Sequence, residues 1–474
     1  MVFTSPVFLF LFLPLALMLV WAAPCRFRNG VLLLLGLFFY AWGEKGYVLL
    51  MALSIGMNYL FGRLLGRWNE CSFGKLVLSV AVLSNLTILI FFKYTNFLLE
   101  NLHTAFDSFD WSTSIPRTNI HLPIGISFFT FEAISYLVDI RRGTIPATRD
   151  PIKLGVFLTL FPHLIAGPIV RYGDMTHSLD HPRLNVAQAA RGVRRLLVGL
   201  AKKLLLANSA GRTADVIFAH QPDWLAPSAI GLGVLCYTLQ IYFDFSGYSD
   251  MAIGLGRLVG FELAENFRYP YAADSITDFW RRWHISLSSW FRDYVYIPLG
   301  GNRQGLIRTA ANLMTVFTLC GLWHGASWSF LLWGWWHGLF LIFERVLSHL
   351  RIPSKWAIVL AVPRHLYVVV VVMLGWIFFR ADNLNHAAAL FRALFHWDEV
   401  AGHPAADFLH RELLLTLIVG GVAALPLAPR LKKWRDHWGF WGRILQTIGL
   451  IALAVLCWIV VVSETYDPFI YFRF

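Results

Sequence analysis

The sequence predicts an all-helical integral membrane protein that crosses the bilayer many times. Two observations carry this prediction. Of the 474 residues, 57% are hydrophobic and only 14% are charged, whereas soluble domains carry about 25% charged residues. Apolar runs also recur along the whole chain, and no polar stretch is long enough to form a second globular domain. We therefore expect one polytopic membrane domain over residues 1–474.

The apolar segments follow one another in an order that predicts about ten to twelve crossings. The first run begins near Val7 without a basic segment before it, so we interpret it as a retained span and not as a removed signal peptide. Two runs differ from ordinary spans. Residues 122–140 carry two acidic residues and suit a helix that lines a cavity, and residues 153–171 contain Pro162 and predict a short re-entrant or broken helix.

The formal charge of +12 results from 40 basic and 28 acidic residues. Basic residues gather in cytoplasmic loops of membrane proteins, and this bias accounts for the charge without any nucleic acid partner. Arg26 and Arg28 directly follow the first run, so the N-terminus is expected outside the cytoplasm. The last span, residues 444–462, leaves a strongly basic loop, and the tail, residues 463–474, is therefore expected outside as well.

Several kinds of enzyme lose support because their motifs are absent. The sequence contains no GxSxG elbow, HExxH motif, Walker loop or Rossmann fingerprint, which argues against serine hydrolases, zincins, ATPases and dinucleotide enzymes. The five cysteines form no CxxC pair and are interpreted as small apolar residues, with no disulfide framework. We expect neither a metal site nor a bound cofactor.

Polar side chains are concentrated among tryptophans in residues 275–325. Charges and imidazoles are costly at membrane depth, so this stretch is a functional candidate. Ser275 and Asp278 fit a capping box and predict a helix that ends at Pro298, with aromatic residues on one side and arginines on the other. This amphipathic pattern is typical of a helix lying in the interface against membrane lipid. His284 falls between the two faces, where a histidine can be structural or catalytic.

His324 has a more specific context. It lies between Gly321 and Gly325 in a nearly uncharged run. Small residues four apart let another backbone approach closely, so the imidazole is expected to face the interior of the helix bundle. A neutral imidazole whose pKa is lowered by desolvation can take a proton from a hydroxyl group. With no nucleophile nearby in the sequence, this histidine indicates acyl transfer or proton-coupled transport.

The same pattern recurs at His337, which lies between Gly334 and Gly338. On one continuous helix His324 and His337 would lie about 220° and roughly 20 Å apart. They can share a site only if the helix breaks, and residues 325–328 are the place for a break. His337 is therefore predicted to be a packing residue or part of a second site.

Six long motifs follow one another along the chain. They are LPIGISFFTFEAISYLVD, FPHLIAGPIVR, LQIYFDFSGYSDMAIGLG, FWRRWHISLSSWFRDYVYIPLGGNR, GLWHGA and GWIFFRADN. They resemble the motifs of the membrane-bound O-acyltransferase family, in the bacterial branch that acetylates alginate and is similar to the membrane protein that D-alanylates teichoic acids. The resemblance covers nearly the whole chain, with its core signature in residues 240–340. It implies a ring of about ten to twelve transmembrane helices, with short re-entrant and interfacial helices, around a central tunnel and funnel.

The resemblance also assigns roles to individual residues. The invariant catalytic histidine of the family falls on His324, and its second signature histidine falls on His284. In the tail, Tyr471 matches a tyrosine proposed to relay the acyl group, although it can equally be an aromatic anchor at the interface. The residues expected to shape the site are Arg281, Arg282, Asp293, Asn302, Trp323 and Asp244.

The function implied by the resemblance is O-acetylation of an exported polysaccharide, alginate or a cellulose-like polymer. The protein would lie in a bacterial inner membrane, take acetyl groups from acetyl-CoA on the cytoplasmic side and act with a periplasmic SGNH-type acetyltransferase. Two alternatives stay open. One is a non-enzymatic transporter or export component in which buried histidines relay protons, and the other is a scaffold that recruits the periplasmic enzyme.

Overall fold

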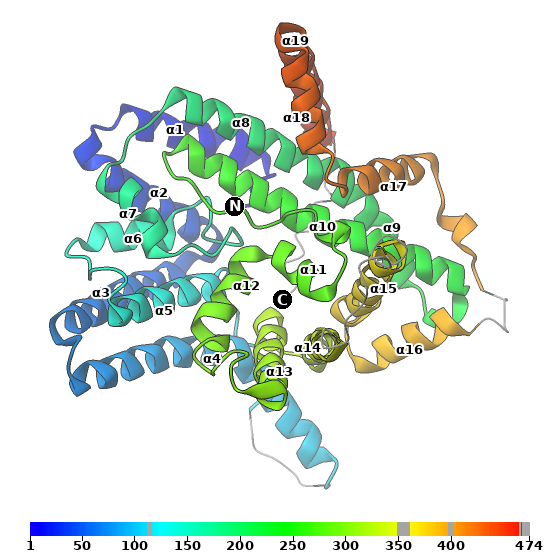
Figure 1. The fold of residues 1–474 in the computed structure, drawn as a ribbon, viewed down its shortest axis with the longest axis horizontal. Helices are drawn as coiled ribbons and strands as arrows, with labels where there is room; N and C mark the ends of the chain where they lie inside the picture. The colour runs from blue at the N-terminus through cyan, green and yellow to red at the C-terminus, as the bar shows by residue number, and fades with distance from the viewer. Residues whose placement is uncertain (111–115, 348–360, 397–401, 464–465, 467–474) are drawn as a thin grey trace. The chain divides into compact units, whose positions relative to one another are not determined.

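The computed structural model describes residues 1–110, 116–347, 361–396, 402–463 and 466. These residues form helices and turns, apart from one isolated β-bridge between Leu225 and His403 (Figure 1). The all-helical prediction is therefore confirmed. By its internal contacts the chain divides into two compact units, Met1–Val193 with Ala252–Ala264 and Arg194–Met251 with Glu265–Phe474.

Six helical segments of the described residues are long and apolar enough to cross a membrane, and a seventh span results if a pair of helices bent by 77° counts as one. This number is smaller than the ten to twelve crossings expected from the apolar runs of the sequence. The difference arises because some apolar helices are short, such as the helical segment Phe8–Ala22. The six segments are Cys25–Trp68, Ser72–Asp107, Pro227–Leu258, Gly305–His324, Ala361–Arg380 and Gly439–Ser463, and the bent pair is Arg411–Ala423 with Ala428–His437.

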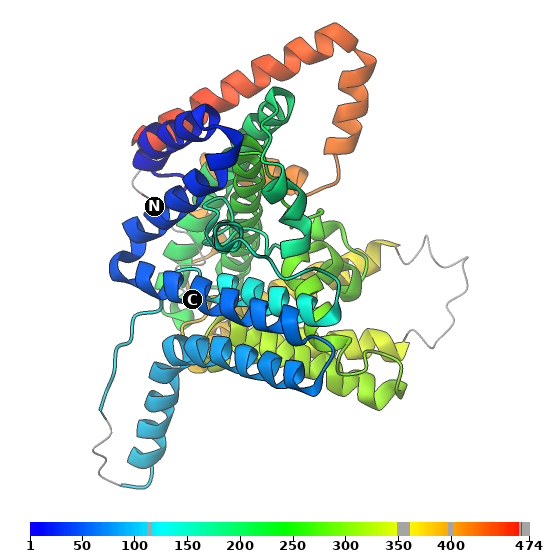
Figure 2. The ribbon, with the colours of Figure 1, turned by 90° about the vertical axis from the view of Figure 1, so that its left-hand side faces the viewer.

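The first unit is built mainly from the N-terminal helices, with α3, α4 and α5 packed side by side (Figure 2). In the run 153–171, helix α6 ends at Thr159 and turns follow, which confirms the predicted break. Helix α5 is buried over most of its length, and its Glu132 lies 3.4 Å from His163. The helices are α1 (Leu13–Ala22), α2 (Cys25–Glu44), α3 (Val48–Trp68), α4 (Ser72–Asp107), α5 (Ile126–Arg142), α6 (Pro151–Thr159) and α7 (Tyr172–Asp180).

The second unit contains the stretch that the sequence singles out. Its helices α13 and α14 pack against each other as a hairpin, and α14 also packs against α15 (Figure 1). Helices α8 and α10 run from one unit into the other. The helices are α8 (Val186–Ala201), α9 (Asn208–Ala219), α10 (Pro227–Leu258), α11 (Ile276–Arg282), α12 (Ile285–Phe291), α13 (Gly305–His324), α14 (Trp328–Leu347), α15 (Ala361–Arg380), α16 (Leu384–Phe395), α17 (Arg411–Ala423), α18 (Ala428–His437) and α19 (Gly439–Ser463).

Glycines let the backbones of α13 and α14 come close. A Cβ atom on Gly321 would lie 2.4 Å from the carbonyl oxygen of Phe330, and one on Gly334 would lie 2.2 Å from that of Phe317. Both distances are far below van der Waals contact, so no larger residue fits at either position without a shift of backbone. The close approach expected from the glycine spacing is therefore confirmed, and it fixes how the two helices pack.

The helix predicted from Ile276 to Pro298 is interrupted. Its start is as expected, because the Ser275 hydroxyl accepts a hydrogen bond from the Asp278 N–H. Helix α11 then ends at Arg282, and α12 begins at Ile285. A continuous helix was therefore wrong for this stretch, and His284, expected in an interfacial helix, is fully buried at the break.

Candidate active site

Helix α13 ends at His324 because the next residue leaves the helical conformation. Gly325 is extended, with φ −168° and ψ 150°, and the chain turns before α14 begins at Trp328. This is the break that the sequence required for His324 and His337 to approach one another. It leaves the His324 side chain at a helix end inside the unit, with only 4% of its surface exposed.

Aromatic rings surround the His324 imidazole. The ring centroids of Trp323 and Trp333 each lie 4.9 Å from that of His324, and the Phe379 centroid lies at 5.1 Å. The three rings are inclined to the imidazole by 73° to 85°, which is the edge-to-face arrangement that aromatic pairs prefer. The His324 imidazole therefore lies in a setting of aromatic rings.

A small cavity adjoins His324. Its volume is about 10 Å³, which is room for about one water molecule. Any substrate larger than water must therefore displace a side chain to reach the imidazole. The lining residues are Ile241, Phe245, Trp283, His324, Trp333, Trp376 and Phe379.

A larger apolar groove of about 160 Å³ runs beside α13. Along this helix its wall extends from Leu313 to Cys320, and Cys320 precedes His324 by four residues, about one helical turn. Arg292 also lines the groove, and its guanidinium binds the Asp293 carboxylate at 2.6 Å. The groove therefore has largely apolar walls with one charged side chain, Arg292, and its lining residue Cys320 lies one turn from His324.

His284 is the second imidazole of this region and is fully buried. Its backbone has φ 43° and ψ 56°, a left-handed conformation that is uncommon for residues other than glycine. Its ring lies 4.6 Å from Phe245 and 5.8 Å from Trp323. Trp323 therefore contacts both His284 and His324. Burial lowers the pKa of His284 to about 3, so this imidazole is neutral at physiological pH.

Asn266 explains why the helix breaks at His284. Its backbone carbonyl accepts a hydrogen bond from the Ile285 N–H at 2.9 Å. Its side-chain Oδ1 accepts from the Ser286 N–H at 3.2 Å and from the Ser286 hydroxyl at 3.0 Å. These bonds supply acceptors for N–H groups at the start of α12 that have no partner within the helix. No local pattern in the sequence indicates this contact, because Asn266 lies 18 residues before His284.

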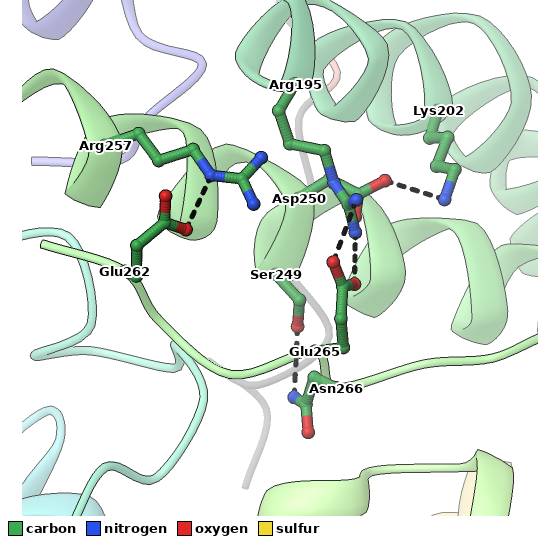
Figure 3. Close-up of polar contacts among 8 residues, drawn as sticks. All are labelled: Arg195, Lys202, Ser249, Asp250, Arg257, Glu262, Glu265 and Asn266. Carbon is green, nitrogen blue, oxygen red and sulfur yellow. Dashed lines mark hydrogen bonds and ion pairs between the residues drawn. The ribbon is translucent and has the colours of Figure 1, made fainter. Parts of the chain in front are cut away.

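A network of ion pairs holds the segment that carries Asn266 (Figure 3). Arg195 of α8 binds Asp250 of α10 at 2.6 Å and Glu265 at 2.5 Å. Lys202 binds the same Asp250 carboxylate at 2.8 Å. Because Glu265 directly precedes Asn266, the network fixes the backbone next to the residue that shapes the His284 break.

Glu344 of α14 is a further residue that sequence reasoning missed. Its carboxylate accepts hydrogen bonds from the backbone N–H groups of Ile276 and Thr277 and from the Thr277 hydroxyl. It therefore caps α11 and ties that helix to α14, which carries Trp333. An acidic residue near the end of a mostly apolar helix was the available signal.

The other residues predicted to shape the site have various surroundings. Trp323 lies between the two histidines, as described above. Asp244 is buried and pairs with Lys203 at 2.8 Å. Arg282 pairs with Asp278 at 2.8 Å, within α11. Arg281 and Asn302 are exposed, Asp293 pairs with Arg292, and Tyr471 lies outside the described residues.

One residue of the C-terminal tail, Tyr466, is held by contacts within the second unit. Its hydroxyl donates to Asp215 at 2.7 Å, and its backbone carbonyl accepts from the Asn208 side-chain amide at 3.0 Å. Asp215 also accepts a hydrogen bond from Arg380 at 3.1 Å. Because Arg380 directly follows Phe379, the tail is linked to the element that forms one wall around His324.

The arrangement can support proton transfer in an apolar site. His324 and His284 are buried and lie against the same tryptophan ring. A neutral imidazole there can accept the proton of a hydroxyl group that attacks a carbonyl carbon. Within the described ranges, His, Cys, Asp and Glu side chains form no group of three or more that could hold a metal ion.

Comparison with known proteins points to one family. Residues 146–380 match MBOAT, the membrane-bound O-acyltransferase family. The chain is 44% identical to the probable alginate O-acetylase AlgI of Azotobacter vinelandii, over 84% of this chain and 79% of that protein. It is 39% identical to the probable alginate O-acetylase AlgI of Pseudomonas putida, over 100% of both chains. It is 34% identical to the peptidoglycan O-acetyltransferase of Helicobacter pylori, over 87% of this chain and 84% of that protein.

Proposed function

Because the chain belongs to the membrane-bound O-acyltransferase family and is a multi-pass O-acyltransferase, we propose that it acetylates an exported polysaccharide. In this proposal it lies in a bacterial inner membrane with both termini in the periplasm. It passes acetyl groups from a cytoplasmic donor across the membrane. The positions of His324 and His284 against one tryptophan, beside a cavity with room for about one water molecule, carry the proposal.

We propose alginate as the first polymer to test, with a cellulose-like polymer as the second. The names of the relatives from Azotobacter vinelandii and Pseudomonas putida, at 44% and 39% identity, support alginate. The relative from Helicobacter pylori is named for peptidoglycan. All three names describe O-acetylation of an envelope or exported polymer, which supports a polysaccharide hydroxyl as the final acceptor.

The proposed donor is acetyl-CoA, whose thioester carries the acetyl group. The apolar groove beside α13 supports this choice, because it suits the uncharged arm of such a donor and its lining residue Cys320 lies one turn from His324. Since the cavity at His324 has a volume of only about 10 Å³, the thioester must displace a side chain to enter. Arg292 offers a charged group in the groove wall for the donor's phosphates.

His324 acts as the general base in the proposed reaction. The acceptor oxygen attacks the thioester carbonyl carbon and its proton moves to the His324 imidazole. The C–S bond then breaks, and the imidazolium returns the proton to the leaving thiolate, so that protons and charge balance. The aromatic rings around His324 leave room for about one water molecule, which limits the competition of water for the acetyl group. His284 positions the donor or the acceptor.

For the periplasmic side, we propose that Tyr471 receives the acetyl group and that an SGNH-type acetyltransferase completes the transfer to the polymer. The contacts of Tyr466 support a role for the tail, because they link it to Arg380 next to Phe379. Tyr471→Phe keeps the ring and removes the hydroxyl. Loss of polymer acetylation in that variant is expected, and normal acetylation would leave Tyr471 as an aromatic anchor.

The central experiment measures ester-linked acetate on the exported polymer and transfer of label from [14C]acetyl-CoA by the purified protein in lipid nanodiscs. His324→Ala is expected to abolish both while the amount of membrane-inserted protein stays unchanged. If the wild-type protein transfers no label and His324→Ala still supports acetylation in cells, the enzymatic assignment to this site fails. That outcome would favour a transporter or a scaffold.

A further inference from the structure

The hydrogen bond between His284 and Asn266 carries information about where the imidazole proton lies. The His284 Nδ1 atom is 3.2 Å from the Asn266 side-chain oxygen, Oδ1. Both side chains are buried, with 0% and 1% of their surfaces exposed. Hydrogen atoms must therefore be assigned from the surrounding contacts, and here the contacts admit one consistent assignment.

The orientation of the Asn266 amide is set by a backbone group. The Ser286 N–H can only donate, and it points at Asn266 Oδ1 at 3.2 Å, so the atom in that place must be an oxygen. The amide nitrogen of Asn266 then faces the Ser249 hydroxyl at 3.1 Å, which can accept from it. A flipped amide would place two donors against each other at Ser286.

The tautomer of His284 follows from that orientation. An oxygen that already accepts from Ser286 can make a favourable contact with Nδ1 only if Nδ1 carries a proton. A neutral imidazole has one proton, so Nε2 carries a lone pair and can only accept a hydrogen bond. Nε2 is buried and has no hydrogen-bond partner among the described residues. A buried acceptor without a partner destabilises the folded state, and His284 carries it in a left-handed backbone conformation that is itself strained.

We propose that Asn266 is a positioning residue that holds His284 as the tautomer protonated on Nδ1 and keeps Nε2 ready to accept a hydrogen bond from a substrate hydroxyl. The inference rests on the proposed O-acyl transfer, in which a hydroxyl group must be oriented beside the reacting carbonyl. Among substrate groups, the acetyl carbonyl cannot bind Nε2, because it offers no donor. The structure thus assigns His284 to the acceptor and not to the acetyl group.

The ion pairs around Asn266 support this role, since they fix its backbone independently of His284. Glu265 is tied to Arg195, and Asp250, next to Ser249, is tied to both Arg195 and Lys202 (Figure 3). A tautomer is useful for orientation only if its partner does not move. Here the partner is Asn266, which directly follows Glu265 and binds Ser249, so the residues on both sides of its contacts are held by ion pairs.

The first test is Asn266→Asp, which retains an oxygen acceptor for Nδ1–H and for the Ser286 N–H. The added carboxylate favours the imidazolium form and raises the pKa of His284, by roughly one to three units for a neighbouring opposite charge. Because the neutral imidazole is the active form, the acid limb of the kcat/KM profile is expected to move to higher pH. At pH values above that limb, where His284 is neutral in both proteins, kcat/KM of the variant should stay within about tenfold of the wild-type value. A loss of the same size at every pH would mean that Asn266 serves structure alone and would overturn the proposal.

The second test does not depend on acyl transfer. Protein labelled with 15N on the histidine rings, compared with His284→Gln for assignment, reports which ring nitrogen of His284 carries the proton. Protonated Nδ1 and unprotonated Nε2 are expected in the wild type, and a loss of this preference is expected in Asn266→Leu. Protonated Nε2 in the wild type would overturn the proposal even if the enzyme acetylates its polymer. Conversely, if the expected tautomer is observed but the protein transfers no acetyl group, the proposed function is wrong and the assignment of the proton still holds.

Ser249→Ala is the matched control. It removes the hydrogen-bond partner of the Asn266 amide nitrogen but leaves every contact of Oδ1 in place. A single neutral hydrogen bond contributes little to stability, so only a small fall in the thermal midpoint is expected, with an unchanged pH profile and tautomer. A change in the tautomer equal to that of Asn266→Leu would show that general loosening of Asn266 explains both variants, and the role assigned to Oδ1 would fail.

Discussion

Two copies of a Trp-His-Gly motif lie in one helical hairpin, and they have different surroundings. His324 is the last residue of α13 and lines a cavity. His337 lies in the middle of α14 and is fully buried in aromatic packing, with the centroids of Trp280 and Trp333 at 5.1 Å and 5.2 Å. Both imidazoles contact Trp333, from which they lie at 4.9 Å and 5.2 Å. The local sequence is nearly the same, so the place of each motif in its helix makes the difference.

The helix end provides what the helix middle cannot. At His324 the chain turns away and leaves a cavity beside the imidazole with room for about one water molecule. At His337 a Cβ atom on Gly375 would lie 3.0 Å from Nε2, so α15 packs directly against the ring. Neither nitrogen of His337 has a hydrogen-bond partner among the described residues. A short motif can therefore mark a site only together with the break that opens it.

The sharpest test of this comparison replaces each histidine by the same apolar ring. His324→Phe is expected to lower acetyl transfer about 10²- to 10⁴-fold, which is the usual contribution of a general base. His337→Phe should stay within a few-fold of wild type. The comparison is broken if His337→Phe loses as much activity as His324→Phe while the protein remains folded, as judged by size-exclusion chromatography in detergent.

A second prediction concerns the packing that brings both motifs to Trp333. Gly321→Ala would place a methyl group 2.4 Å from the Phe330 carbonyl oxygen. Overpacking of this kind costs about 1–3 kcal/mol, and a lower thermal midpoint together with reduced acetyl transfer is expected. Gly449→Ala is the control, since nothing lies within 4 Å of a Cβ atom there. Equal midpoints for the two variants would show that close helix approach does not hold the motifs in place.

A third prediction sharpens the role of α14, which caps α11 through Glu344. Glu344→Gln replaces a carboxylate that accepts from Ile276 and Thr277. Hydrogen bonds to charged groups contribute about 1.5–3 kcal/mol, and part of this remains with the neutral amide. The thermal midpoint should fall more than for Glu412→Gln, because the Glu412 side chain is 56% exposed in its ion pair with Arg212. A smaller fall in the midpoint for Glu344→Gln than for this control would show that α14 does not stabilise α11.

The smallest expected effect is on the stability of His337→Phe. Removing two buried ring nitrogens that lack described partners removes an unfavourable desolvation, while the ring contacts with Trp280 and Trp333 remain. Replacing such polar groups by apolar ones of similar shape is nearly neutral or stabilising. The thermal midpoint is expected to stay equal or rise. A marked fall would indicate that His337 binds an internal water molecule or a substrate group.

Local sequence signals predicted parts of this region well. Hydroxyl and carboxylate spacing predicted the cap at Ser275, and glycine spacing predicted the close approach of α13 and α14. The angular separation of His324 and His337 allowed a shared site only if the helix broke, and residues 325–328 were named as the place where the structure does separate α13 from α14. Each signal depends on residues within a few turns of one another.

The parts that were missed depend on contacts between distant residues. The continuous helix through His284 failed because Asn266, 18 residues earlier, supplies acceptors at the break. The cap on α11 comes from Glu344, 67 residues after Thr277. Tyr466 binds Asp215 across 251 residues. Every buried polar group needs a hydrogen-bond partner. The local sequence does not indicate which distant residue supplies that partner.

The small size of the cavity at His324 bears on how an acyl donor would be protected from hydrolysis. With about 10 Å³ beside the imidazole, the closed site has little room to hold both an acyl donor and an attacking water. For the thioester donor that we propose, this lack of room would keep water away from the acyl group until the acceptor is bound. We expect that enlarging the space would allow hydrolysis of the donor in place of acyl transfer.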